Sequence, residues 1–128
     1  MDPIRREPLL PENAPKPLGP YSHGIRAGRW IFCSGTIGND PTTGRLVPGG
    51  VEAEARQALV NLGNTLRAGG SSMAHVVKTT VFLTDLGQFA AMNAVYATFF
   101  PEDPPARDRK STRLNSSHMS ESRMPSSA

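Results

Sequence analysis

The sequence has little of what marks disulfide-bonded, secreted or membrane-spanning proteins. Cys33 is the only cysteine among 128 residues, which excludes a disulfide within the chain and a zinc site built from several cysteines. No run of about 18 apolar residues occurs, and the residues before Tyr21 lack the apolar core of a signal peptide. We therefore expect a soluble protein of a reducing compartment, the cytoplasm, with no membrane partner.

The formal net charge of +3 is unevenly distributed along the chain. Residues 1–107 carry ten basic and nine acidic side chains, whereas residues 108–128 carry four basic and two acidic ones. Because most of the positive excess belongs to the C-terminal segment, the basic pI gives little support for a nucleic-acid partner. P-loop, G-x-G-x-x-G and zinc-ligand spacings are also absent from the sequence.

The length allows one domain. Six prolines within residues 1–20 predict an extended N-terminal arm, because proline is poorly tolerated in helices and in central strands. From Tyr21 onward, two short segments around Ala27 and Gly28 predict a hairpin. The cluster NDPTTGRL then has the composition of a turn.

Two helices and one strand are expected in the second half of the chain. Apolar residues recur at helical spacing over residues 51–66, and a glycine pair then ends the segment. The β-branched segment HVVKTTVFLT predicts a strand. Asp85 and Gln88 resemble a capping box for a second, aromatic-rich helix that ends at Pro101. The order is that of an α+β domain whose helices pack on one face of a sheet.

This plan is incomplete at its C-terminal end. Strands are expected after the second helix to balance the two before the first, yet residues 108–128 contain four apolar side chains and no strand pattern. We therefore expect residues 21–107 to form an incomplete domain and residues 108–128 to be a disordered tail. The bare sheet edge that results would make the chain prone to aggregation.

Four residues could carry chemistry, although spacing alone favours simpler roles for them. Asn93 puts an amide on the apolar stripe of the second helix, where a structural hydrogen bond is the commoner role. Ser34 suits a turn serine and Tyr21 a packing aromatic. Arg107 follows two prolines and an alanine, a rigid setting that favours a carboxylate clamp, but composition alone favours a solvated loop arginine. Cys33 is expected to pack as a small apolar side chain.

Four segments stand in a characteristic order: ENAPKPLGPYSHGI, IFCSGTIGNDPTTGRL, HVVKTTVFLTDLGQFAAMNAVYATFF and PPAR. In this order and spacing, from residue 12 to residue 107, the chain resembles the RidA/YjgF family of reactive-intermediate deaminases. The resemblance implies a chorismate-mutase-like α+β fold and a homotrimer with active sites in clefts between subunits. It implies hydrolysis of 2-imino acids, such as 2-iminobutanoate and 2-iminopropanoate, to 2-oxo acids and ammonia, without a cofactor or a metal.

Carried over position by position, the resemblance places the family's arginine at Arg107, its site tyrosine at Tyr21, its strand-end serine at Ser34 and its helix asparagine at Asn93. It implies that the Arg107 guanidinium holds the substrate carboxylate while hydroxyl groups orient the imine nitrogen beside a water. Arg107, Tyr21 and Ser34 are then the expected catalytic residues. Asn93 joins Arg107 in binding the substrate.

The chain departs from the family after Arg107. The family continues with two strands and a water-activating glutamate, whereas this chain reads DRKSTRLNSSH, a string that resembles sequencing adapter read as coding DNA. Glu121 has no strand context and is not assigned the glutamate's role. Three alternatives stay open: a non-catalytic binder of small carboxylates or of a partner, a chain inactive because its C-terminus is not native, and an endoribonuclease, for which the sequence offers no histidine pair.

Overall fold

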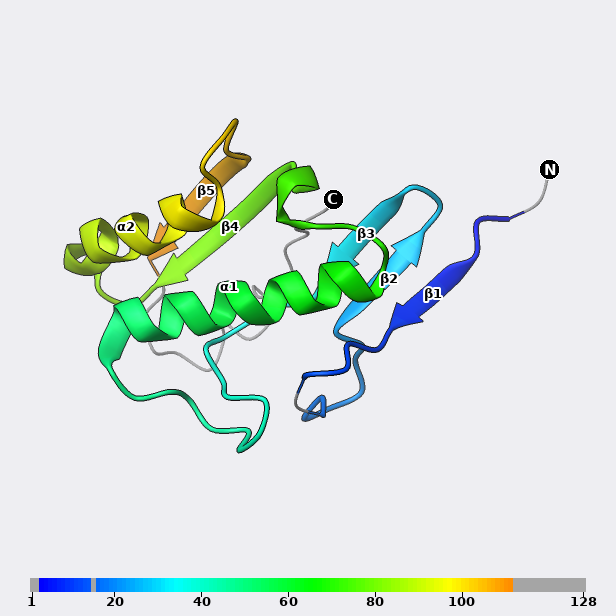
Figure 1. The fold of residues 1–128 in the computed structure, drawn as a ribbon, viewed down its shortest axis with the longest axis horizontal. Helices are drawn as coiled ribbons and strands as arrows, with labels where there is room; N and C mark the ends of the chain where they lie inside the picture. Colours follow the sequence, from blue (N-terminus) through cyan, green and yellow to red (C-terminus); the bar gives the residue numbers. More distant parts are fainter. Residues whose placement is uncertain (1–2, 15, 112–128) are drawn as a thin grey trace.

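The structure is a computed structural model that describes residues 3–14 and 16–111 (Figure 1). Its elements follow one another as β1 (Arg6–Leu9), β2 (Gly24–Ala27), β3 (Trp30–Cys33), α1 (Gly50–Ala68), β4 (Lys78–Leu83), α2 (Phe89–Phe99) and β5 (Ala106–Ser111). Short 3-10 turns lie at Met73–His75 and Leu86–Gln88. This is the α+β class that the sequence predicts.

Most elements form where the sequence pattern predicts them. The hairpin of β2 and β3 turns through Gly28, whose φ of 62° lies in the left-handed region that favours glycine. The glycine pair follows α1 directly, and α2 ends before Pro101. Asp85 accepts a hydrogen bond from the backbone N–H of Gly87, so it caps the 3-10 turn before α2 and does not form the expected capping box with Gln88.

The sequence predicts neither of the two strands at the ends of the fold. Residues 6–9 of the proline-rich arm form β1, an edge strand antiparallel to β2, because a proline at a sheet edge need not donate a hydrogen bond. Residues 106–111 form β5, parallel to β4, although the sequence predicts no strand from residue 108 onward. Arginine side chains of β5 lie over aromatic rings of α2, so the strand contacts this helix through guanidinium groups and not through large apolar side chains. Residues 112–128 of the expected tail lie outside the described part of the chain.

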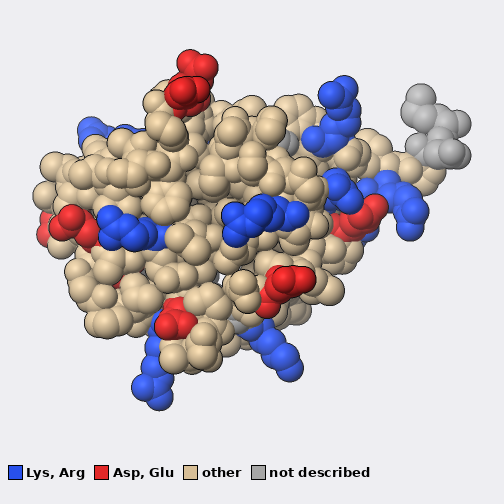
Figure 2. Space-filling view, in the orientation of Figure 1, with Lys and Arg blue, Asp and Glu red and all other residues tan. Residues whose placement is uncertain are grey.

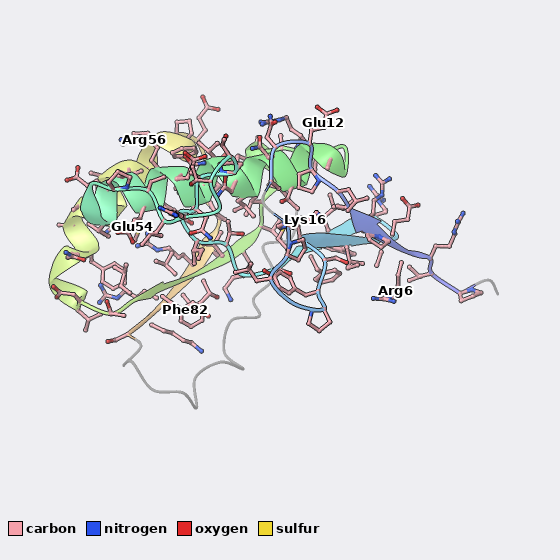
Figure 3. The ribbon with its side chains drawn as sticks, turned by 90° about the horizontal axis from the view of Figure 1, so that it is seen from below. Arg6, Glu12, Lys16, Glu54, Arg56 and Phe82 are labelled. Atoms are coloured by element: carbon pink, nitrogen blue, oxygen red, sulfur yellow. The ribbon has the colours of Figure 1, made fainter. Side chains whose placement is uncertain are left out.

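The strands form two short sheets. In one sheet β1, β2 and β3 pair antiparallel in that order, and in the other β4 pairs with β5. Among residues 3–14 and 16–111, β3 and β4 each keep one edge without a strand partner. Both helices lie on the same side of the strands, and α1 runs alongside both sheets (Figures 1 and 3).

The core fills the space between the helices and one face of the strands. Leu66 of α1 is fully buried, and Ile31 of β3 and Tyr96 of α2 belong to the same apolar cluster. No described helix is long and apolar enough to cross a membrane. The core therefore fixes the strands that carry the predicted site residues against the two helices.

Within residues 3–14 and 16–111 no helix lies on the opposite face of the strands, and we call it the helix-free face. Trp30 and Phe32 alternate with buried residues of β3 and are 51% and 46% exposed on it. Ile25 lies opposite Phe32 in the antiparallel register and therefore shares this face. Phe82 of β4 also points away from the helices (Figure 3). Four apolar side chains thus lie on this face, Trp30 and Phe32 exposed and Ile25 and Phe82 half-buried.

Candidate active site

A pocket with a volume of about 330 Å³ opens beside the start of β2 and the end of β3. The loop between β1 and β2 supplies Tyr21 and His23, the segment after β3 supplies Ser34, and α1 supplies Asn61 and Thr65. We call it the Tyr21–Ser34 pocket. Its lining combines hydroxyl, imidazole and amide groups, which suits a small polar ligand.

Two hydrogen bonds hold Ser34 in this pocket. Its backbone N–H donates to the carbonyl of His23 over 3.0 Å, and its hydroxyl donates to the carbonyl of Ser22 over 2.6 Å. The hydroxyl oxygen retains lone pairs that can accept a hydrogen bond from a ligand. Ser34 is therefore a positioned acceptor rather than an activated nucleophile.

Tyr21 lies next to His23, with ring centroids 6.4 Å apart and the rings nearly perpendicular at 78°. Such edge-to-face contact holds an aromatic ring in place without burying it completely. Tyr21 is 48% exposed, and its phenol oxygen accepts a long hydrogen bond of 3.5 Å from the backbone N–H of Leu18. The phenol O–H can therefore donate to a bound molecule.

Asn61 of α1 fixes the far wall of the pocket. Its side-chain amide donates to the carbonyls of Ile37 and Asn39 over 3.3 and 2.8 Å and accepts from the Gln57 amide over 2.8 Å. Gly38 lets this loop approach the helix, since a Cβ there would lie 2.5 Å from a backbone oxygen of α1. Helical periodicity places Asn61 on the polar side of the helix, so the sequence does not single it out. The one sequence signal for its role is Gln57 four residues earlier, a spacing at which two amides can form a hydrogen bond.

Arg107 of β5 and Asn93 of α2 form a second group of predicted site residues. Arg107 Nη1 donates to Asn93 Oδ1 over 2.8 Å, and the guanidinium carbon lies 4.8 Å from the centroid of the Tyr96 ring. The Tyr96 hydroxyl in turn forms a buried hydrogen bond of 2.7 Å with the hydroxyl of Thr79. A ring and an amide thus orient the guanidinium, whose further N–H donors match the geometry of a carboxylate.

The structure groups the four predicted residues two by two. Tyr21 and Ser34 line one pocket, and Arg107 and Asn93 are hydrogen-bonded to each other, but neither Arg107 nor Asn93 lines that pocket. The elements that carry the second pair, β5 and α2, lie toward the end of the molecule opposite β1 (Figure 1). One chain therefore does not bring all four side chains around a single pocket.

Cys33 is a packing residue, as its apolar surroundings predict. It is buried, and burial raises the pKa of its thiol from 9.0 to about 12, so the thiol stays protonated near neutral pH. Within the part of the chain that the structure describes, no three His, Cys, Asp or Glu side chains gather in a group that could hold a metal ion.

Comparison with known sequences gives close matches over most of the chain. The profile of the family described as endoribonuclease L-PSP matches residues 11–115. The chain is 47% identical over 107 residues to the 2-iminobutanoate/2-iminopropanoate deaminase of Mus musculus, covering 84% of this chain and 79% of the mouse protein. It is 48% identical over 102 residues to a RutC family protein of Pyrococcus horikoshii, covering 80% of this chain and 81% of that protein.

Solved structures have the same fold. A protein from Thermotoga maritima described as a putative endoribonuclease superposes with a TM-score of 0.81 and 40% identity, over 84% of this chain and 85% of that one. Escherichia coli TdcF with bound serine superposes with a TM-score of 0.78 and 36% identity, over 84% of this chain and 87% of that one. The family profile, which matches residues 11–115, spans Tyr21, Ser34, Asn93 and Arg107.

Proposed function

The chain belongs to the endoribonuclease L-PSP family and is similar in sequence and fold to RidA and YjgF proteins, and on this basis we propose that it hydrolyses reactive 2-imino acids to 2-oxo acids and ammonia. The expected substrates are 2-iminobutanoate and 2-iminopropanoate, after which the mammalian relatives are named. The resemblance stated from the sequence is confirmed at the level of the family.

The oriented guanidinium of Arg107 is the observation that carries this proposal. In a 2-imino acid the carboxylate is bonded directly to the imine carbon, so a clamp on the carboxylate also fixes the carbon that water attacks. Asn93 and Tyr96 hold the guanidinium before substrate arrives, which reduces the entropy lost on binding. The hydroxyls of Tyr21 and Ser34 are assigned to the imine nitrogen and the attacking water. Imine hydrolysis needs little more than such positioning and one proton-transfer group.

The complete site lies between neighbouring copies of the chain in this proposal. The two pairs of site residues are separate within one chain, and the helix-free face exposes Trp30 and Phe32. An exposed apolar face of this kind is typical of a surface that another chain covers. In a ring of three identical copies, each contact joins two different surfaces, so Arg107 of one copy can face the Tyr21–Ser34 pocket of the next.

Ammonia release from freshly generated 2-iminobutanoate tests the proposed function. A dehydratase supplies the imine, and the rate is compared for no added protein, the wild-type chain and the Arg107→Ala variant. The wild-type chain is expected to accelerate ammonia release, and the variant is expected to fall toward the uncatalysed rate, since it lacks the carboxylate clamp. Equal rates for wild type and variant would contradict the proposal.

A second candidate is a carboxylate-binding protein without turnover. The observation that favours it is the E. coli relative TdcF, whose structure is described with bound serine, an amino acid with a free carboxylate. Saturable binding of 2-oxobutanoate that Arg107→Ala abolishes, with no ammonia release from the imine, would select this candidate.

The family description also mentions RNA cleavage, and the surface gives that activity no support on the face seen in Figure 2. Acidic and basic side chains are interspersed there, and the basic ones do not form a continuous stripe (Figure 2). A nucleic-acid footprint consists of clustered positive charge.

A further inference from the structure

We infer that His23 is the proton-transfer residue of the Tyr21–Ser34 pocket, a role that rests on the proposed deaminase function. Its imidazole takes a proton from the attacking water and returns it to the nitrogen that leaves as ammonia. Arg107 fixes the substrate, and Ser34 and Tyr21 orient the reacting groups. His23 adds the group that moves the proton.

Backbone pairing sets His23 opposite Ser34. The register of β2 and β3 pairs Gly24 with Cys33, and the hydrogen bond from Ser34 N–H to the His23 carbonyl extends this register by one residue. Residues that face each other in an antiparallel pair have Cβ atoms about 4.5–5.5 Å apart and carry their side chains on the same side. His23 and Ser34 therefore line the same pocket from adjacent positions.

The ring contact with Tyr21 limits how the imidazole can turn. Tyr21 packs edge-to-face on His23 from within the same loop. His23 is half-buried and belongs to the lining of the pocket. An imidazole held in this way can meet a bound water without a large rearrangement.

The other groups around the pocket are less suited to proton transfer near neutral pH. Lys16 and Tyr21 are the other titratable groups of the lining, both from the loop between β1 and β2. The segment after β3 contributes hydroxyl and backbone groups, and α1 contributes Asn61 and Thr65, which do not titrate. Among common side chains, imidazole is the one whose proton exchange matches neutral pH.

The proposed step balances as a hydrolysis. The water oxygen bonds to the imine carbon, the π electrons of the C=N bond move to nitrogen, and neutral imidazole takes one water proton. The imidazolium then gives its proton to the nitrogen of the carbinolamine. The imidazole then carries the hydroxyl proton to the same nitrogen, and the C–N bond breaks with its electron pair on nitrogen. The carbonyl of the 2-oxo acid forms, ammonia leaves and the imidazole is neutral again.

The test compares His23→Gln with wild type by measuring kcat/KM for 2-iminobutanoate as a function of pH. Glutamine keeps a hydrogen-bonding side chain but cannot exchange a proton. We expect wild-type activity to fall on the acidic side, where a protonated imidazole cannot accept a proton. We expect His23→Gln to lose about 10²- to 10⁴-fold in kcat/KM together with that pH dependence.

His75→Gln is the matched control, because His75 is exposed on a 3-10 turn and bonds Ser72 away from the pocket. It should retain the wild-type rate and pH profile. Binding of 2-oxobutanoate and the melting temperature should be unchanged in His23→Gln, which separates proton transfer from folding and clamping.

The possible outcomes separate the role of His23 from the proposed deaminase function. A wild-type chain that releases no ammonia overturns the deaminase and the role of His23 together. A wild-type chain that is active, with His23→Gln retaining the wild-type pH profile at any rate, overturns the role of His23 alone. Loss of 2-oxobutanoate binding in His23→Gln also overturns it, since His23 would then position substrate.

Discussion

Replacing Arg107 with lysine tests whether the planar guanidinium, and not the positive charge alone, is required. Lysine keeps the charge at the start of β5 but presents a point-like ammonium, so it cannot make two parallel hydrogen bonds to a carboxylate. It also lacks the planar group with which the arginine stacks on Tyr96 while it donates to Asn93. Loss of one hydrogen bond to a charged group costs about 1.5–3 kcal/mol, which corresponds to about a 10- to 150-fold fall in kcat/KM.

Arg109→Lys is the matched control for this measurement. Arg109 lies two residues further along the same face of β5, and its guanidinium carbon is 4.9 Å from the centroid of the Phe89 ring. Both substitutions remove an arginine that stacks on α2, so both are expected to lower the melting temperature by similar amounts. Only Arg107→Lys is expected to lower kcat/KM for 2-iminobutanoate. Equal catalytic losses in the two variants would refute the assignment of Arg107 as the clamp.

Three further predictions concern stability and protonation. Thr79→Val leaves the buried Tyr96 hydroxyl without its partner 2.7 Å away and should lower the free energy of unfolding in urea by about 1–3 kcal/mol; an unchanged value would show that the bond contributes nothing. Leu66→Ala leaves a cavity at a fully buried position and should lower the free energy of unfolding by about 2–5 kcal/mol in the same titration. Leu86→Ala, at a side chain that is 55% exposed, should change it little, and similar losses in the two variants would contradict the core described above. Because burial raises the pKa of the Cys33 thiol from 9.0 to about 12, the folded chain keeps a proton that the unfolded chain releases between these values. The free energy of unfolding should therefore fall as pH rises above 9.0, and Cys33→Val should fall less steeply; parallel slopes would count against the buried thiol.

The sequence predicts the parts of the fold that local patterns control. The helix over residues 51–66 and the hairpin at Gly28 follow from apolar periodicity and from glycine, and both form close to the expected positions. β5 was missed because its inward-facing residues are Arg107 and Arg109, whose stems and guanidinium groups cover aromatic rings. A search for alternating apolar residues cannot find such a strand.

The arrangement of the candidate site depends on contacts between distant parts of the chain. Spacing alone favoured simple structural roles for Tyr21, Ser34, Asn93 and Arg107, and only the family resemblance singled them out. The register of β4 and β5 sets Arg107 opposite Thr79, beside the Tyr96 hydroxyl, and this pairing is not visible in either segment alone. Only the three-dimensional structure shows that Tyr21 and Ser34 lie apart from Asn93 and Arg107 within one chain.

Mixing two inactive variants tests most directly whether an imine-hydrolysing site is shared between copies of the chain. Arg107→Ala retains the Tyr21–Ser34 pocket, and Ser34→Ala retains the clamp. When the two are unfolded together and refolded as mixed rings, about a quarter of the contacts between copies join an intact pocket to an intact clamp. We predict that ammonia release from 2-iminobutanoate returns to about a quarter of the wild-type rate. A mixture as inactive as its components, with mixed rings formed, would contradict a site built between subunits.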